Sequence, residues 1–521
     1  MSARQWNIGS ITKKRAMLSP DKTAIIYEGR TITYKALNDG ANRVAHYLQE
    51  KGLKKGDRIS VLLFNCPEFL EVYFAAAKLG IIFVPLNFRL IGPELEYQLN
   101  NCESRLLVFH DTLIENIESV RSNTKVDEDK FLYLKSGLPN CAGCPEWATD
   151  YKKIVESCSM AEPIPREPIY FDDPLCIMYT SGVTGAPKGA VLSHQQTYFK
   201  NFQIILYTDM SVDDRFLAQS PLFHSAGLFF LATPVLCCGA TMIVRQSFEP
   251  EQFTIDIGKY KPTIIFCMTA MWKMILETKR LDSVDTTGVR VVVGGGEKTP
   301  LSLFDELSSR GLHMQMGYGQ TENSVMMIMP KEYVEKKKGS IGKPGFFTDV
   351  WIAHKDGKKA APGEIGEIVA RGLPVMSGYW NMPDMTAKTI VDGVLHTGDL
   401  GYMDEDGFFY IVDRAKDMYR SGGENIYPAE VEKVLLNYPK ILNIAIIGVP
   451  DERWGETGKA FIVLRAGETL TREEATEFLK GKVAKYKYPR YLEFVDQLPM
   501  TASGKVKKAD LKKKYGVRLN A

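Results

Sequence analysis

The sequence predicts an α/β protein in which a large N-terminal domain of stacked strand–helix sheets precedes a small α+β domain. Two observations support this prediction. The first hundred residues alternate stretches of helical apolar spacing with short apolar runs, and this alternation is typical of parallel sheets covered by helices. Near residue 400 the pattern changes to a hairpin and a charged stretch, and a further segment with its own helices and strands follows.

The first well-defined helix is expected to begin after Thr33, because apolar residues recur at 34, 37, 41, 44, 45 and 48. Thr33 can cap its start and Gly52 can end it. A second helix is expected from Pro67 to about Lys78, ended by Gly80. Short apolar runs predict strands at 58–64, 81–86, 105–110, 263–268 and 289–296.

One apolar run, residues 227–244, could be mistaken for a membrane span. It has only marginal length for a span, and Pro234 and Gly239 divide it into a short helix and a strand, so we interpret it as buried core. The N-terminus lacks the apolar core of a signal peptide. The net charge of +2 gives no attraction to nucleic acid or acidic membranes. We therefore expect a soluble cytoplasmic protein with no transmembrane segment and no nucleic-acid partner.

The nine cysteines are scattered along the chain. Cys141 and Cys144 form a CxxC pair, but a zinc site would need a second pair at suitable spacing, and the sequence has none. We interpret the cysteines as thiols in a reducing compartment.

The C-terminal region has its own local signals. A hairpin is expected to turn on residues 404–407, and the charged stretch 413–417 follows. Farther on, Thr471 and Glu474 have the spacing of a capping box. A compact domain behind a short polar linker fits this pattern. We place the large domain at 1–413, the linker at 414–417 and the small domain at 418–521.

Residues 179–190, "YTSGVTGAPKGA", combine three glycines, three hydroxyl side chains and one lysine. Glycines let the backbone approach a ligand closely, and hydroxyls and a lysine add donors and charge, which suits a polyphosphate. The Walker pattern GxxxxGK[ST] is absent. Considered alone, the stretch could instead be a glycine-rich surface turn.

Three further stretches carry polar groups that suit a nucleotide. In "GYGQTE" (317–322), Thr321 and Glu322 follow two glycines, and a carboxylate beside phosphates makes sense as a Mg²⁺ ligand. Asp399, in "HTGDLG", could accept both hydroxyls of a ribose, and Arg414 could hold ribose or phosphate. In "TASGKV" (501–506), Lys505 is expected to lie on a loop.

These stretches, together with "DRAKDMYRSGGENIYP" (413–428), occur in the order and spacing of the adenylate-forming superfamily. The chain resembles this superfamily, which includes acyl-CoA synthetases, aryl-CoA ligases, firefly-type luciferases and the adenylation domains of peptide synthetases, over essentially its whole length. The resemblance implies a β-barrel-like subdomain in the large domain and a mobile small domain with its hinge at Lys416. It also allows a homodimer.

The resemblance also implies roles for individual residues. The catalytic group is expected to be Lys505, Thr321, Glu322 and His224, with Glu322 as the Mg²⁺ ligand. Lys505 bridges the substrate carboxylate and the α-phosphate, which Thr321 also contacts. The phosphate loop comprises Thr180, Ser181, Gly182, Thr184, Gly185 and Lys188. The adenine is bordered by Gly295, Gly296, Glu297, Tyr318 and Gly319. Asp399 and Arg414 hold the ribose, and Gly422 and Gly423 line a channel for pantetheine.

Several alternatives stay open at individual positions. His224 is expected near the carboxylate and the thiol route, but it could be a core histidine whose hydrogen bonds are satisfied. Lys188 could be a solvated loop lysine. Val183 stands where the superfamily usually has Ser or Thr, so one phosphate donor is lost, and we expect altered nucleotide affinity. A hydrogen bond to a charged group is worth about 1.5–3 kcal/mol, which limits the loss.

The predicted function is that of an ATP- and Mg²⁺-dependent acyl-CoA synthetase. It would convert a carboxylic acid to acyl-AMP with release of pyrophosphate, and then transfer the acyl group to coenzyme A. The expected acyl site, residues 223–231, 294–296 and 318–327, is apolar and contains no arginine, which argues against a dicarboxylate. Medium- or long-chain fatty acids are the first choice of substrate, and aryl or alicyclic acids of the benzoate or cinnamate type are the second.

Other functions remain as alternatives to CoA ligation. A standalone enzyme that loads a carrier protein would share all these motifs, and luciferase-type oxidation is less favoured. A nucleotide-binding regulatory protein would be the alternative without catalysis. The presence of all the expected charged residues argues against it; these are Lys188, Glu322, Asp399, Arg414 and Lys505.

Overall fold

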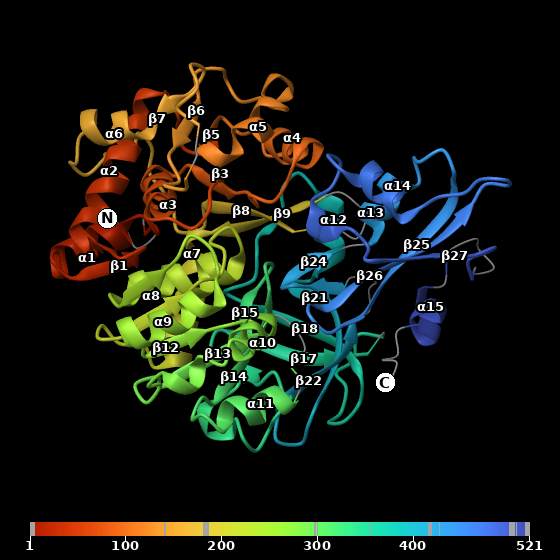
Figure 1. Ribbon diagram of the computed structural model, residues 1–521. Helices are drawn as coiled ribbons and strands as arrows, with labels where there is room; N and C mark the ends of the chain where they lie inside the picture. The colour runs from red at the N-terminus through yellow and green to blue at the C-terminus, as the bar shows by residue number, and fades with distance from the viewer. Residues whose placement is uncertain are drawn as a thin grey trace. The chain divides into compact units, whose positions relative to one another are not determined.

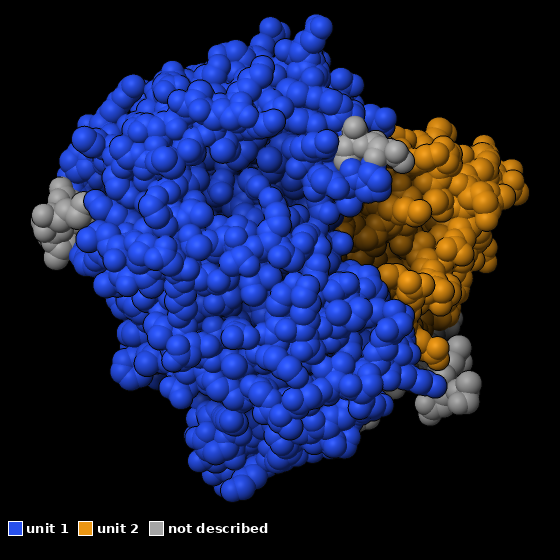
Figure 2. Space-filling view, turned by 60° about the vertical axis from the view of Figure 1, so that its left-hand side comes forward, with its two compact units in different colours: residues 1–88, 99–179, 189–412 blue, residues 89–98, 180–188, 413–521 orange. Residues whose placement is uncertain are grey.

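The computed structural model describes residues 6–139, 142–180, 187–295, 299, 301–354, 356–414, 419–426, 428–499, 506 and 508–515. Figure 1 follows the chain by colour. The chain divides into two compact units, coloured separately in Figure 2. The first comprises residues 1–88, 99–179 and 189–412, and the second comprises residues 89–98, 180–188 and 413–521. The hinge at 414–417 remains a prediction, because residues 415–418 lie outside the described part of the chain.

The described residues of the first unit include a nine-stranded sheet with parallel central strands. Its order is β16 (Lys343–Pro344), β15 (Ser324–Ile328), β14 (Met314–Gln320), β13 (Val291–Gly295), β12 (Ile264–Phe266), β10 (Arg215–Ala218), β11 (Thr241–Val244), β1 (Thr23–Tyr27) and β2 (Arg30–Thr33). The strands from β14 through β1 run parallel to their neighbours. Strands β2, β15 and β16 pair antiparallel. The central strands are buried runs rich in β-branched residues, as is typical of parallel sheets with both faces covered.

A second sheet, eight-stranded in the described part of the chain, is also mainly parallel. Its order is β19 (Gly378–Tyr379), β9 (Lys188–Ser193), β8 (Pro174–Thr180), β4 (Ile82–Pro85), β3 (Arg58–Leu62), β5 (Leu106–His110), β6 (Phe131–Leu134) and β7 (Thr149–Asp150). The mixed α/β class with mainly parallel sheets is therefore confirmed.

The N-terminal helices follow the predicted pattern closely. Thr33 caps α2, because its hydroxyl accepts the N–H of Ala36 (3.1 Å). Gly80 ends α3 with a φ of +70°. Helices up to residue 389 are α1 (Ser10–Leu18), α2 (Tyr34–Glu50), α3 (Pro67–Leu79), α4 (Gly92–Asn101), α5 (Ile114–Glu118), α6 (Tyr151–Ser157), α7 (His194–Thr208), α8 (Thr233–Cys238), α9 (Pro250–Tyr260), α10 (Thr269–Glu277), α11 (Leu301–Ser308) and α12 (Pro383–Thr389).

The apolar run 227–244 is core, as predicted. It contains most of a π-helix (Ala226–Ala232), then α8 and strand β11, and Gly239 separates the last two with a φ of +89°. Leu228, Phe229 and Phe230 are almost fully buried. Among the described residues, no helix combines the length and apolar character that a membrane crossing requires.

A third sheet has five strands within the described residues, and the predicted barrel-like closure of this subdomain remains a prediction. The order is β17 (Thr348–Ala353), β18 (Gly366–Gly372), β21 (Val394–Met403) and β20 (Ile390–Val391), and β22 (Phe409–Arg414) also pairs with β21. The predicted hairpin at 404–407 joins β21 to β22. The Asp404 N–H donates to Phe408 O (2.9 Å), and the Gly407 N–H donates to Asp404 O (3.0 Å).

The second unit has its own sheet and helices, and it confirms a smaller α+β domain at the C-terminal end. The sheet order is β24 (Glu424–Ile426), β23 (Tyr419–Ser421), β26 (Gly455–Leu464) and β25 (Ile441–Asp451), with β27 (Tyr491–Phe494) beside β26. Its helices are α13 (Pro428–Leu435), α14 (Arg472–Leu479) and α15 (Lys508–Tyr515). Thr471 and Glu474 form the predicted capping box of α14.

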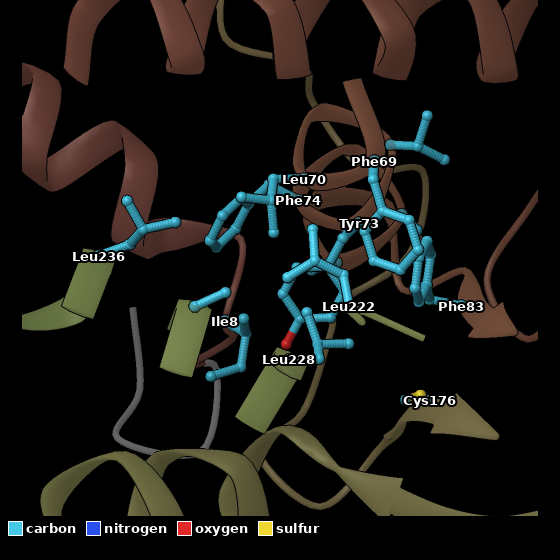
Figure 3. Packing of buried hydrophobic residues seen from close by; sticks show 14 of the residues in the cluster. Ile8, Phe69, Leu70, Tyr73, Phe74, Phe83, Cys176, Leu222, Leu228 and Leu236 are labelled. Atoms are coloured by element: carbon cyan, nitrogen blue, oxygen red, sulfur yellow. The ribbon is translucent and has the colours of Figure 1, made fainter. Parts of the chain in front are cut away.

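Aromatic side chains from α3 fill the core of the first unit (Figure 3). The ring of Tyr73 meets Phe74 edge-on at 5.1 Å and Phe83 edge-on at 5.2 Å. Cys176 from β8 and Leu228 from the π-helix belong to the same buried cluster. The π-helix is therefore anchored in the core, and the residues before and after it are held in place.

Candidate active site

Three predicted site segments meet at one edge of the nine-stranded sheet. Strands β10, β13 and β14 run in the same direction in this sheet, so their carboxyl ends lie at the same edge, where open α/β sheets bind ligands. His224 follows β10, Gly295 ends β13, and β14 leads through Tyr318 to Glu322.

Glycines allow the backbone at this edge to pack tightly. A Cβ on Gly295 would lie 2.6 Å from Gly317 O, and a Cβ on Gly319 would lie 1.5 Å from Ser324 O. Only glycine fits at 319, because the chain returns immediately into β15. Ser324 takes a φ of +56° in this turn. The turn that carries Thr321 and Glu322 is thereby fixed by sterics.

Asp399, on β21, is held by two protein donors. The Tyr318 hydroxyl donates to Asp399 Oδ2 (2.6 Å), and Gln320 Nε2 donates to the same oxygen (2.9 Å) and to Thr397 O (2.9 Å). Asp399 is only 3% exposed, and a buried carboxylate needs such donors. From the sequence, both carboxylate oxygens were expected to accept the hydroxyls of a ribose. In the structure, Oδ2 accepts hydrogen bonds from Tyr318 and Gln320.

Glu322 is oriented by Tyr379, which lies on β19. The Tyr379 hydroxyl donates to Glu322 Oε1 (2.7 Å), and the Met376 N–H donates to Glu322 O (2.7 Å). The side chain is half-buried, and its Oε2 accepts no hydrogen bond from the described residues. A carboxylate oxygen that accepts no hydrogen bond from the described residues fits a Mg²⁺ ligand.

A Mg²⁺ ion at Glu322 would need ligands from the substrate. Nowhere in the described part of the chain do three His, Cys, Asp or Glu side chains group as a metal site. Mg²⁺ usually binds through one or two carboxylates plus substrate phosphates and water. The residues present therefore suit an ion that arrives with a nucleotide.

His224 lies in a row of aromatic rings. Its ring centroid is 4.4 Å from that of Phe223, and Phe223 meets Phe88 edge-on at 5.3 Å. The backbone N–H of His224 donates to Pro221 O (3.1 Å). The side chain is half-buried. Its role in the reaction remains a prediction.

Thr180 and Lys188 flank the predicted phosphate loop. Thr180 ends β8 and Lys188 begins β9, and the Thr180 hydroxyl donates to Lys188 O (3.4 Å). Lys188 is 8% exposed, so the alternative of a solvated loop lysine is wrong. The other predicted loop residues lie outside the described residues, namely Ser181, Gly182, Thr184 and Gly185.

Other predicted residues also lie outside the described part. These are Gly296, Glu297, Lys416 and Lys505. Arg414 ends β22, and the structure describes its backbone but not its side chain. Their roles remain predictions.

Gly422 and Gly423 form the two-residue turn between β23 and β24. Their φ values are +57° and +84°, as in the tight hairpin turns that favour glycine. A Cβ on Gly422 would lie 2.9 Å from a ring carbon of Trp454, and the Gly422 N–H donates to Trp454 O (3.1 Å). Turn geometry and the close Trp454 ring thus account for the glycine pair, and the pantetheine channel remains a prediction.

Comparison with protein families identifies the fold and the chemistry. The family described as AMP-binding enzyme matches residues 12–380, and its C-terminal domain family matches residues 430–505. The chain belongs to the AMP-binding enzyme family. This result confirms the resemblance to the adenylate-forming superfamily.

Relatives of this AMP-binding enzyme are CoA ligases that match it nearly end to end. A feruloyl-CoA synthase of Amycolatopsis sp is 38% identical, over 98% of this chain and 100% of the relative. An indoleacetate–CoA ligase of Aromatoleum aromaticum is 35% identical, over 96% of each chain. A long-chain-fatty-acid–CoA ligase of Bacillus subtilis is 35% identical, over 95% of this chain and 92% of the relative.

A solved structure shows the same architecture. The o-succinylbenzoate CoA synthetase of Bacillus subtilis superposes with a TM-score of 0.86 at 31% identity, over 97% of this chain and 98% of that chain. This AMP-binding enzyme is therefore an acid–thiol ligase that uses ATP and coenzyme A, as the sequence predicted.

Sequence reasoning missed three polar residues of this AMP-binding enzyme. Gln320 and Tyr379 orient the two acidic residues, and Lys200, on α7, is a buried lysine beside the π-helix. Tyr379 had a local signal, since it lies in the glycine- and aromatic-rich stretch "SGYWN". Lys200 had no such signal, because a lysine within a helix is ordinarily solvated.

Proposed function

We propose that this AMP-binding enzyme activates an aromatic carboxylic acid and transfers it to coenzyme A. The observation that carries the proposal is the end-to-end similarity to a feruloyl-CoA synthase, at 38% identity over 98% of this chain. Identity to a long-chain-fatty-acid ligase is 35% over 95%. The aryl acid, placed second by the sequence, therefore has more support than the fatty acid placed first.

Aromatic side chains at the carboxyl edge of the sheet support the same substrate class. Phe266 ends β12, and its ring lies 5.1 Å from that of Phe230 on the π-helix. Phe223 and His224 follow β10 at the same edge. Aromatic rings attract a flat ring through edge and offset contacts. Such surroundings suit an aromatic acid better than an alkyl chain of no fixed shape.

In the first step an oxygen of the substrate carboxylate attacks the α-phosphorus of ATP. A new O–P bond forms, the bond to the β-phosphate oxygen breaks, and pyrophosphate leaves with that electron pair. Glu322 would hold Mg²⁺, which offsets negative charge on the phosphates. Asp399 would hold the ribose, with its orientation set by Tyr318. Thr180 and Lys188 would contact the β- and γ-phosphates.

In the second step the thiolate of coenzyme A attacks the acyl carbon. The C–S bond forms, the C–O bond to the phosphate breaks, and AMP leaves. Lys505 is needed in the first step, where it brings positive charge to two approaching anions. It would then have to leave, because the thiol needs that space. A hinge movement at Lys416 would provide this change. Mg²⁺, a cytoplasmic location and a homodimer stay predictions from the sequence.

ATP–pyrophosphate exchange with a panel of acids tests the proposal. The panel contains ferulate, 4-hydroxycinnamate, cinnamate, benzoate, decanoate, palmitate and acetate. We expect the cinnamate-type acids to have kcat/KM values about 10-fold or more above the fatty acids, since a well-matched apolar site discriminates at this level. Product mass after adding coenzyme A, or a holo-carrier protein instead, identifies the acceptor. Higher kcat/KM for decanoate or palmitate would contradict the proposal.

A further inference from the structure

Lys200 differs from two other buried lysines in the described part of the chain. Lys78 Nζ donates to Asn38 Oδ1 and to Glu162 Oε2, both at 2.8 Å. Lys487 Nζ donates to carboxylates at 2.6 and 2.7 Å. Lys200 is 2% exposed, and its Nζ has no hydrogen-bond partner among the described residues. A buried amine without an acceptor is costly in either protonation state.

The amine lies where three elements of the first unit pack together. Helix α7, the π-helix and β15 all contact one another. Lys200 Nζ lies over the ring of Phe229, 5.3 Å from its centroid, and Phe229 is fully buried on the π-helix. β15 begins two residues after Glu322. Lys200 is therefore next to the segment 223–231 that the sequence assigned to the acyl group.

A protonated amine carries donors and no acceptor, so the missing partner of Lys200 would be an acceptor. Burial lowers the pKa of Lys200 from its ordinary value of 10.5 to about 7, although the negative charge of Glu322 acts in the opposite direction. Burial holds the pKa of Cys176 high, so this thiol is neutral. Leu228 (Figure 3) and Phe230, on either side of Phe229 in the π-helix, are buried in the same apolar core cluster. Binding sites fix the orientation of a ligand with a few buried polar groups beside apolar side chains.

We propose that Lys200 determines acid specificity, and that its Nζ binds an oxygen substituent on the ring of the aromatic acid. The inference rests on the proposed function and adds the substrate class to it: ring-hydroxylated or otherwise oxygen-bearing aromatic acids. Lys200 lies outside residues 223–231, 294–296 and 318–327, the segments in which the sequence analysis found no arginine.

The test compares two acids that differ by one hydroxyl, 4-hydroxycinnamate and cinnamate. The full-length enzyme and the Lys200→Met variant are assayed by pyrophosphate exchange. We expect the unmodified enzyme to favour 4-hydroxycinnamate by about 10-fold or more in kcat/KM, because a buried donor left without its acceptor disfavours the unsubstituted acid. Lys200→Met should bring this ratio to within about 3-fold of one and should retain activity on cinnamate.

Lys78→Met is the matched control. It removes a buried lysine whose partners are Asn38 and Glu162, so the ratio between the two acids should not change. Lys200→Gln keeps a hydrogen-bond donor and should retain part of the preference for 4-hydroxycinnamate over cinnamate. This variant replaces Lys200→Met in the test if the methionine variant fails to fold.

Two outcomes overturn the inference while the proposed function stands. In one, Lys200→Met keeps the full preference for the hydroxylated acid. In the other, the folded variant loses activity on both acids equally, which would place the amine at the shared carboxylate. If the unmodified enzyme exchanges fatty acids and neither cinnamate, the proposed function fails, and the inference fails with it.

Discussion

The hydroxyl of Tyr318 donates a hydrogen bond to Asp399 Oδ2 across 2.6 Å, and so joins the last parallel strand of the nine-stranded sheet to the five-stranded antiparallel sheet. Tyr318 also packs in one buried cluster with Ile352, Ile368 and Phe409 of that second sheet. The position of the Asp399 carboxylate therefore depends on how these two sheets pack.

Tyr318→Phe should weaken nucleotide binding. The variant keeps the ring but removes one of the two donors that orient Asp399, while Gln320 remains. We expect the KM for ATP to rise about 10-fold, near the lower end for hydrogen bonds to charged groups, and kcat to change much less. Steady-state kinetics with varied ATP measure this split. Tyr402→Phe, on the same strand as Asp399 and stacked on Tyr410, is the control and should leave the KM unchanged.

Glu322→Gln should sharply reduce adenylation. Replacing the carboxylate by an amide removes the charge that would hold Mg²⁺, and we expect kcat to fall by about 100-fold or more, as for loss of a group that stabilises transition-state charge. Tyr379→Phe leaves the carboxylate but not its orienting donor. It should raise the Mg²⁺ concentration needed for half-maximal rate by several-fold, with full activity restored at high Mg²⁺. If the unmodified enzyme, Glu322→Gln and Tyr379→Phe all reached half-maximal rate at the same Mg²⁺ concentration, Glu322 would not be a Mg²⁺ ligand.

Lys505→Ala should separate the two half-reactions. Because the lysine serves only the attack on the α-phosphorus, pyrophosphate exchange should be lost while supplied acyl-AMP is still converted to the thioester. Both rates are measured on the same preparation. Equal losses in the two assays would contradict the division of roles between adenylation and thioester formation.

Lys200→Met should stabilise the protein most at low pH. The folded pKa of Lys200, about 7 against an ordinary 10.5, means that between these values the unfolded chain binds more protons. The free energy of unfolding of the unmodified enzyme therefore rises with pH above 7. Relative to the variant, it should gain about 1–3 kcal/mol between pH 7 and pH 9. Denaturant unfolding at the two pH values measures this difference.

The matched variant Lys78→Met should lower the free energy of unfolding, whereas Lys200→Met should raise it. Lys78 is paired with Glu162, so its removal leaves a carboxylate without its charge partner and lowers stability at both pH values. A loss of stability in Lys200→Met as large as that in Lys78→Met would mean that Lys200 carries no unpaired buried amine.

Lys487→Met should destabilise the second unit. Lys487 lies between the buried carboxylates of Glu94 and Glu430, at 2.6 and 2.7 Å. Removing the cation leaves two buried acids facing each other, which costs about 3–5 kcal/mol and should lower a calorimetric transition by roughly 5–15 °C. Lys480→Met breaks an exposed pair with Glu477 and should shift the transition by less than about 2 °C.

The elements that sequence reasoning located correctly depend on local signals. The Thr33 cap, the Thr471–Glu474 capping box and the turn at 404–407 each act within four residues, so their chemistry is visible in the sequence. The glycine pair at 422–423 was also conspicuous, but the local turn explains it without a ligand. Its neighbour Trp454 lies 32 residues farther along the chain, beyond the reach of a local pattern.

The site residues could be predicted by type but not by partner. Asp399 lies 81 residues from Tyr318, and Glu322 lies 57 residues from Tyr379. Both pairs exist only because separate strands are brought together by the fold. Lys200 was overlooked for the same reason: a lysine in a helix is ordinarily solvated, and its burial follows from the packing of the π-helix and β15 against α7.

The π-helix at residues 226–232 makes the direction of its side chains sensitive to the length of the chain. A π-turn holds one residue more than an α-turn. Deleting one residue there would turn the wide coil into an α-turn and shift Phe229 and Phe230 relative to the residues before them. A Cβ on Gly227 would lie 2.0 Å from Pro221 O, so the start of the helix has no room to move. A change of one residue in length would therefore redirect several buried side chains at once.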